Sequence, residues 1–97
     1  MVVGVLRLEL QLYSPQNIKE KRAIVKSLLG RCRERFPVSC AETGLQETWQ
    51  RAQLGFVLVM SSPDVGIDAM FEKIEAEILR SSVAEICDSS REILHYE

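Results

Sequence analysis

A strict alternation of apolar and polar side chains runs through the start of the chain. Every second position from Leu6 to Leu12 is a leucine, and the positions between them, from Arg7 to Gln11, are polar. Successive side chains of a strand point to opposite faces of a sheet, so this period predicts one long strand over residues 2–12. Another layer must cover its leucine face, which argues against an all-helical fold.

The next segment changes to the helical period. Apolar residues between Ile18 and Phe36 recur at spacings of three and four, and Pro37 would stop the helix that they predict. Asn17 followed by Glu20 has the form of a capping box, with Asn in place of the usual Ser or Thr. We therefore expect a helix from about Ile18 to Arg35.

The remaining patterns complete one small domain. A second amphipathic helix is predicted to start at Ser62-Pro63-Asp64 and to end near Arg80. Three further strands are predicted at residues 38–43, 49–60 and 83–96, the last with a bulge or break at the polar stretch 88–91. The order βαββαβ predicts an α+β fold, a ferredoxin-like sandwich with a four-stranded antiparallel sheet and two helices on one face. All 97 residues are expected to form this single domain.

Composition and motifs exclude several classes of protein. The chain is 46% hydrophobic and 27% charged, which is typical of a globular protein. It opens without a signal-like segment, and its longest apolar run, 54–60, is far shorter than the ~20 residues that cross a bilayer, so we expect a cytoplasmic protein with no membrane partner. Cys32, Cys40 and Cys87 are odd in number and widely spaced, so no disulfide, metal or cofactor is expected.

Signals of catalysis are weak. The single histidine, His95, has no neighbouring Cys or Ser that it could activate. The carboxylates of the second helix are interpreted as a solvated face rather than an acid/base pair; they are Asp68, Glu72, Glu75 and Glu77. We therefore expect no enzymatic activity and no catalytic residues.

Charge divides the chain unevenly. Residues 1–60 carry nine Lys and Arg against five Asp and Glu, a net charge of +4, whereas residues 61–97 carry three against nine, a net charge of −6. At about 100° per residue, one flank of the first helix collects Lys19, Arg22, Lys26 and Arg33 over about 20 Å. Such a row could follow a phosphate backbone. It could equally face solvent or complement the acidic second helix, where exposed ion pairs contribute only about 0 to 1 kcal/mol each.

The uncovered face of the predicted sheet is a second candidate surface. If the first and third strands are neighbours, Val3 and Val5 lie near Val57 and Val59, and this apolar patch predicts an interface, most simply a homodimer. The polar half of this face offers no stacked aromatics of the kind that RNA-recognition motifs use. Arg51 is predicted either to contact nucleic acid or to pair with Glu9 or Glu47. Trp49 is predicted either to cover the end of the sheet or to contact RNA or another ligand.

Three segments carry a resemblance to a known family. Residues 17–22, 38–42 and 49–55 read NIKEKR, VSCAE and WQRAQLG, and they resemble the bacterial YlxP-like family, domain of unknown function 503, whose pattern is close to SLKEKR, VSxAE and WQRAxLG. The resemblance covers essentially the whole chain. It implies a ferredoxin-like fold and a cytoplasmic bacterial protein whose relatives are often encoded among translation and ribosome-maturation genes, and it implies no enzyme activity.

Two functional hypotheses follow. The first is a non-enzymatic binding module, associated with structured or ribosomal RNA in translation or ribosome biogenesis, that uses the basic flank of the first helix. The alternative is a homo-oligomeric protein-interaction or small-ligand regulatory domain that uses the open sheet face. Salt-dependent retention of RNA would distinguish them.

Overall fold

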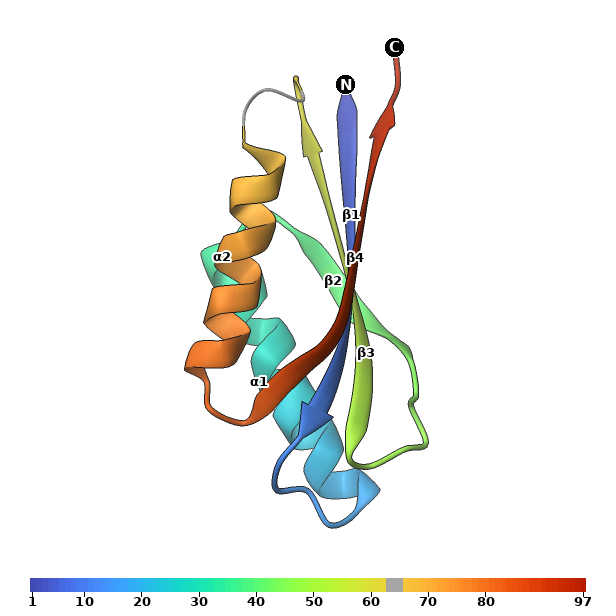
Figure 1. Cartoon of the computed structure of the whole chain (residues 1–97), viewed down its shortest axis with the longest axis vertical. Coiled ribbons are helices and arrows are strands. Elements are labelled where there is room, and N and C mark those ends of the chain that lie inside the picture. Colours follow the sequence, from blue (N-terminus) through green and yellow to red (C-terminus); the bar gives the residue numbers. More distant parts are fainter. Residues whose placement is uncertain (63–65) are drawn as a thin grey trace.

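The computed structural model describes residues 1–62 and 66–97 (Figure 1). The elements in these ranges are β1 (Val2–Leu12), α1 (Ile18–Arg35), β2 (Ser39–Gly44), β3 (Arg51–Met60), α2 (Ile67–Arg80) and β4 (Ala84–His95). This order confirms the βαββαβ prediction. The predicted start of the second helix involved Pro63 and Asp64, which lie outside the described residues.

The strands form an antiparallel sheet in the order β2-β3-β1-β4. Both helices cover the same face of the sheet, which leaves the other face open (Figure 1). The long strand β1 lies in the centre, because its leucine face needs neighbours on both sides as well as helices above it. The fold is therefore the ferredoxin-like α+β sandwich that the sequence predicted.

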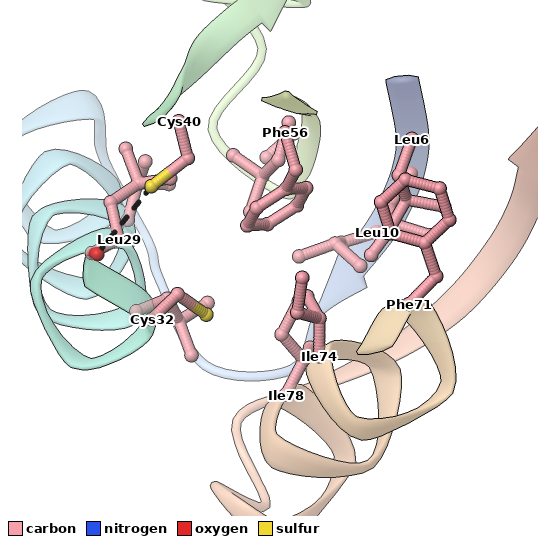
Figure 2. Packing of buried hydrophobic residues seen from close by; sticks show 14 of the residues in the cluster. Leu6, Leu10, Leu29, Cys32, Cys40, Phe56, Phe71, Ile74 and Ile78 are labelled. Atoms are coloured by element: carbon pink, nitrogen blue, oxygen red, sulfur yellow. Dashed lines mark hydrogen bonds between the residues drawn. The ribbon is translucent and has the colours of Figure 1, made fainter. Parts of the chain in front are cut away.

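The core lies between the leucine face of β1 and the two helices. Leu6, Leu8 and Leu10 have no exposed surface. Phe56 of β3 and Phe71 of α2 belong to the same cluster and lie near Leu6 and Leu10 (Figure 2). A Cβ atom added at Gly4 would lie 2.9 Å from both Ile67 Cγ2 and Phe71 Cζ. The absence of a side chain at this position allows α2 to approach the backbone of β1 closely.

The predicted cap of α1 is present. The side-chain oxygen Oδ1 of Asn17 accepts a hydrogen bond of 2.9 Å from the backbone N–H of Glu20. The carboxylate of Glu20 in turn accepts from the backbone N–H of Gln16 at 3.0 Å. Two N–H groups at the helix start, which have no partner within the helix, are thus satisfied, and this fixes where the helix begins.

The last strand differs from the prediction in one detail. The register of β4 against β1 shifts once, between the pairs Glu9↔Asp88 and Leu10↔Ile86, so the extra residue is Cys87. The bulge therefore precedes the polar stretch 88–91, which pairs regularly with β1. Polar side chains are compatible with pairing here because β4 is an edge strand and residues 88–91 are exposed.

Candidate nucleic-acid interface

The basic row on α1 lies at the surface. Lys19, Arg22 and Lys26 are exposed, and within residues 1–62 and 66–97 none of these three side chains forms a hydrogen bond or ion pair. The guanidinium group of Arg33 donates a hydrogen bond of 2.6 Å to the carbonyl oxygen of Cys40 in β2. We call these four residues the α1 flank. It runs along the β2 edge of the molecule, with Arg33 held in place and three cations free to meet an anion.

The ion pairs between the helices use other residues. Arg31 and Arg35 lie about 180° around α1 from the α1 flank, and their side chains reach Glu77 of α2. The possibility that the predicted row complements the acidic helix is therefore not realised. The acidic residues Asp68 and Glu75 instead pair with Arg91 of β4, at 3.1 and 2.6 Å.

Glu77 corrects one sequence-based interpretation. Together with the other carboxylates of α2 it was expected on a solvated face, but only 3% of it is exposed. Its Oε1 lies 3.1 Å from Arg35 Nε and 4.0 Å from Arg31 Nε, and its Oε2 lies 3.0 Å from the guanidinium of Arg80. Glu77 is buried because it lies on the side of α2 that faces α1, where three arginines surround its carboxylate.

A buried ion pair was missed. Lys21 has no exposed surface, and its ammonium nitrogen lies 2.9 Å from Glu42 Oε2 and 2.5 Å from the carbonyl oxygen of Leu45. The helical spacing could have indicated this burial, because Lys21 lies three residues after Ile18 and four before Val25, within the apolar stripe of α1. Both partners also fall in motif segments, 17–22 and 38–42.

The open face of the sheet has the predicted register. Val3 is paired with Val59 and Val5 with Val57, and the valines of β3 are 62% and 39% exposed. Beside them a shallow depression is lined by Val5, Val57 and Gly55. The four valines thus form one apolar patch, called here the valine patch.

Arg51 lies on this open face, apart from the α1 flank. Its guanidinium is 3.3 Å from Glu9 Oε2, and the other oxygen of Glu9 is 3.1 Å from Arg7. Arg7 also reaches Asp88 of β4 at 2.9 Å. Of the two alternatives for Arg51, the structure shows pairing with Glu9, so this arginine and the four residues of the α1 flank do not form one surface. Trp49, just before β3, is 40% exposed.

The thiols and the histidine do not gather into a site. Burial, with smaller contributions from the nearby Cys40 and Glu77, raises the pKa of Cys32 from 9.0 to about 11. Cys87 and His95 are exposed on β4. Among the residues that the structure describes, no three His, Cys, Asp or Glu side chains are arranged to hold a metal ion. In the same residues no helix is long and apolar enough to cross a membrane.

Fold and charges together define a small ferredoxin-like α+β domain with an exposed basic row on its helical layer. The model of the family described as "Protein of unknown function (DUF503)" matches residues 3–91, and the chain belongs to that family. The resemblance in the three sequence motifs is thereby confirmed.

Known proteins extend this comparison. The uncharacterized protein YlxP of Bacillus subtilis (strain 168) is 41% identical over 61 residues, which is 63% of this chain and 66% of that relative. The solved structure of protein YJCS has a TM-score of 0.59 at 11% identity and covers 93% of this chain and 96% of its own. The crystal structure of a putative chlorite dismutase, TA0507, has a TM-score of 0.51 at 13% identity over 96% of this chain and 44% of its own. Both structural likenesses show the fold alone.

Proposed function

We propose that this protein is a non-enzymatic binding module that contacts the phosphates of structured RNA, such as ribosomal RNA, through the α1 flank. One observation carries the proposal: Lys19, Arg22 and Lys26 are exposed and without an ion pair among the described residues. The arginines of β1, β3 and β4 are instead neutralised by carboxylates; these are Arg7, Arg51 and Arg91. Unneutralised cations in a row attract a polyanion most strongly.

The geometry supports a contact with the backbone rather than with the bases. Lys19 and Lys26 are separated by two turns of α1, about 10 Å at a rise of 1.5 Å per residue. Long flexible side chains over this distance can reach successive phosphates of a folded strand. RNA duplexes are recognised mainly through shape, phosphate and 2′-hydroxyl contacts, which is the kind of recognition that such a row can provide. We place this contact in translation or ribosome biogenesis, the setting that the sequence resemblance implies.

The test measures RNA affinity as a function of salt. If three cations displace counterions from the RNA, the logarithm of the RNA association constant should fall with the logarithm of the salt concentration, with a slope of about −2 to −3. The variant Lys19→Gln/Arg22→Gln/Lys26→Gln should lose nearly all of this slope and most of the retention on a ribosomal RNA fragment.

The control variant is Thr48→Glu/Ser61→Glu/Ser89→Glu. It changes the net charge by the same amount at three exposed positions outside the α1 flank. It should retain most of the affinity. Equal loss in both variants, or no salt-dependent binding by the parent, would show that the α1 flank is not an RNA contact.

A second candidate function is self-association through the valine patch. The observation that favours it is the 62% exposure of Val59 beside Val57, on a face that no helix covers. Contiguous apolar surface of this kind is typical of protein interfaces. We propose a symmetric homodimer as its simplest form. The alternative use of the same face is the binding of a small apolar ligand in the depression beside Gly55.

A further inference from the structure

A second concentration of positive charge lies between the two helices, away from the α1 flank. A depression there is lined by Arg35, Phe36, Lys73, Ala76, Glu77 and Arg80. Arg31 adjoins it through its contact with Glu77. We call Arg31, Arg35, Lys73 and Arg80 the interhelical cluster. Three of these cations, Arg31, Arg35 and Arg80, contact the carboxylate of Glu77.

Most of the charge in the cluster is not neutralised. Glu77 has one negative charge, and it already contacts Arg31, Arg35 and Arg80. The Lys73 side chain is exposed and, within the described parts of the chain, forms no hydrogen bond or ion pair. Two other acidic groups of α2, Asp68 and Glu75, do not compensate, because Arg91 holds them on the β4 side.

Glu77 also arranges the donors. Arg35 directs Nε to Oε1 at 3.1 Å and a terminal nitrogen to Oε2 at 3.4 Å, and Arg80 approaches Oε2 at 3.0 Å. Each guanidinium has five N–H donors, so both arginines keep donors that Glu77 does not use. Because Glu77 is almost fully buried, it holds the arginines from below while 56% of the Arg35 side chain and 67% of the Arg80 side chain stay exposed. This is a preorganised, outward-facing set of donors.

Stabilisation of helix ends does not account for the whole cluster. Cations in the last turn of a helix interact favourably with its macrodipole, and Arg35 and Arg80 occupy such positions. Lys73, however, lies in the middle of α2, and Arg31 precedes the last turn of α1. A bound anion would explain why Lys73 lines the same depression as Arg35 and Arg80, with Arg31 beside it at Glu77.

We propose that the interhelical cluster binds a phosphate group, with Arg35 and Arg80 as hydrogen-bond donors and Lys73 as the point charge. Arginine forks match phosphate oxygens, and such charge-assisted bonds are about twice as strong as neutral ones. The site is separate from the α1 flank and does not depend on it. Two sources supply this chemistry: a phosphodiester of a nucleic acid or a free phosphorylated small molecule.

The test is a titration of the full chain with inorganic phosphate, followed through the arginine side-chain N–H resonances by NMR. Saturable shifts are expected for Arg35 and Arg80, beyond those caused by sodium chloride at the same ionic strength. Lys73→Gln should weaken phosphate binding about tenfold, because it removes one charge-assisted contact without touching a buried group. Ser89→Glu, at an exposed position of β4 outside both basic surfaces, lowers the net charge by the same amount; it is the matched control and should leave the affinity for phosphate unchanged.

Two further titrations, with a short RNA and with a nucleoside monophosphate, identify which molecule supplies the phosphate group. A short RNA that shifts the same resonances, while a nucleoside monophosphate does not, assigns the site to a phosphodiester backbone; the reverse result assigns it to a small phosphorylated ligand. Absence of saturable shifts with all three probes, or equal phosphate affinity of Lys73→Gln and the parent, overturns the proposal. Either result leaves the RNA contact of the α1 flank to be judged by its own variants.

Discussion

The ammonium group of Lys21 lies 2.9 Å from Glu42 Oε2, and the lysine side chain has no contact with solvent. Lys21 comes from α1 and Glu42 from the edge strand β2, and the same ammonium group donates to Leu45 in the connection to β3. A single side chain thus joins three segments. Because burial removes water from the ammonium group, its positive charge is tolerated only while Glu42 and Leu45 remain in contact with it.

Loss of Lys21 is therefore expected to be costly. Lys21→Met leaves the carboxylate of Glu42 largely buried and uncompensated, and we expect about 3 kcal/mol lower free energy of unfolding. In Lys21→Met/Glu42→Leu no charge is left behind, so the double variant should recover much of that loss. Urea denaturation of the parent, both single variants and the double variant measures the coupling. A cost below about 1 kcal/mol for Lys21→Met would contradict the structural role of this pair.

Two glycines should respond to alanine with opposite signs. Gly4→Ala places a Cβ atom 2.9 Å from Ile67 Cγ2 and Phe71 Cζ, so overpacking should lower the free energy of unfolding by about 1–3 kcal/mol. Gly30→Ala, in α1, meets no heavy atom within 4 Å and should raise it by about 0.5–1 kcal/mol. Thermal unfolding of both variants tests the close packing of α2 on β1. Similar effects at the two positions would argue against that packing.

The raised pKa of Cys32 predicts a loss of stability at alkaline pH. Between pH 9.0 and about 11 the unfolded chain ionises this thiol while the folded protein keeps it protonated. The unfolded state then binds fewer protons, so the free energy of unfolding falls as pH rises, by about 1 kcal/mol near pH 10. Below pH 9 the thiol is protonated in both states and contributes no slope. Cys32→Ala should show a shallower decline in the same denaturation series; identical slopes for the two proteins would refute this assignment.

The valine patch predicts a dimer that a charge can dissociate. At roughly 25 cal/mol per Å², covering a few hundred Å² of apolar surface on each chain contributes several kcal/mol toward association. We expect the parent to sediment as a dimer and Val5→Lys or Val57→Lys to sediment as monomers. Leu79→Lys is a matched control, because Leu79 is 51% exposed on α2 and outside the patch.

The main structural rival is edge-to-edge pairing of two chains through β2, which would leave the valines uncovered. Under that arrangement the Val57→Lys variant would remain dimeric. A monomeric parent would exclude both interfaces.

Hydrophobic periodicity accounts for how much of the fold could be predicted. The leucines of β1 alternate because one face is buried. Once β1 and β3 are neighbours, the match of their buried faces places Val5 and Val57 together on the open face. The bulge was predicted at 88–91 but lies one residue earlier, at Cys87. The side chains of an exposed edge strand do not indicate which residue is left unpaired with the neighbouring strand.

Polar residues were harder to place. Glu77 was taken as a surface residue, and the burial of Lys21 was not predicted, because charge normally indicates solvent and only tertiary partners make such burial tolerable. The interhelical cluster could not be predicted for the same reason, because it joins Arg35 to residues of α2 about 40 positions later. For Arg51, the sequence left Glu9 and Glu47 as equal choices, and only the geometry of the sheet selects Glu9.

The one-sided placement of the helices has a consequence for avidity. If two chains join through their open sheet faces, both helical layers face outward, and each pair carries two α1 flanks on opposite surfaces (Figure 1). Such a dimer is bivalent: once one flank holds an RNA, a second contact on the same folded molecule becomes intramolecular. Weak phosphate contacts, each of modest strength, would then combine into tight retention on a large RNA but not on a short one.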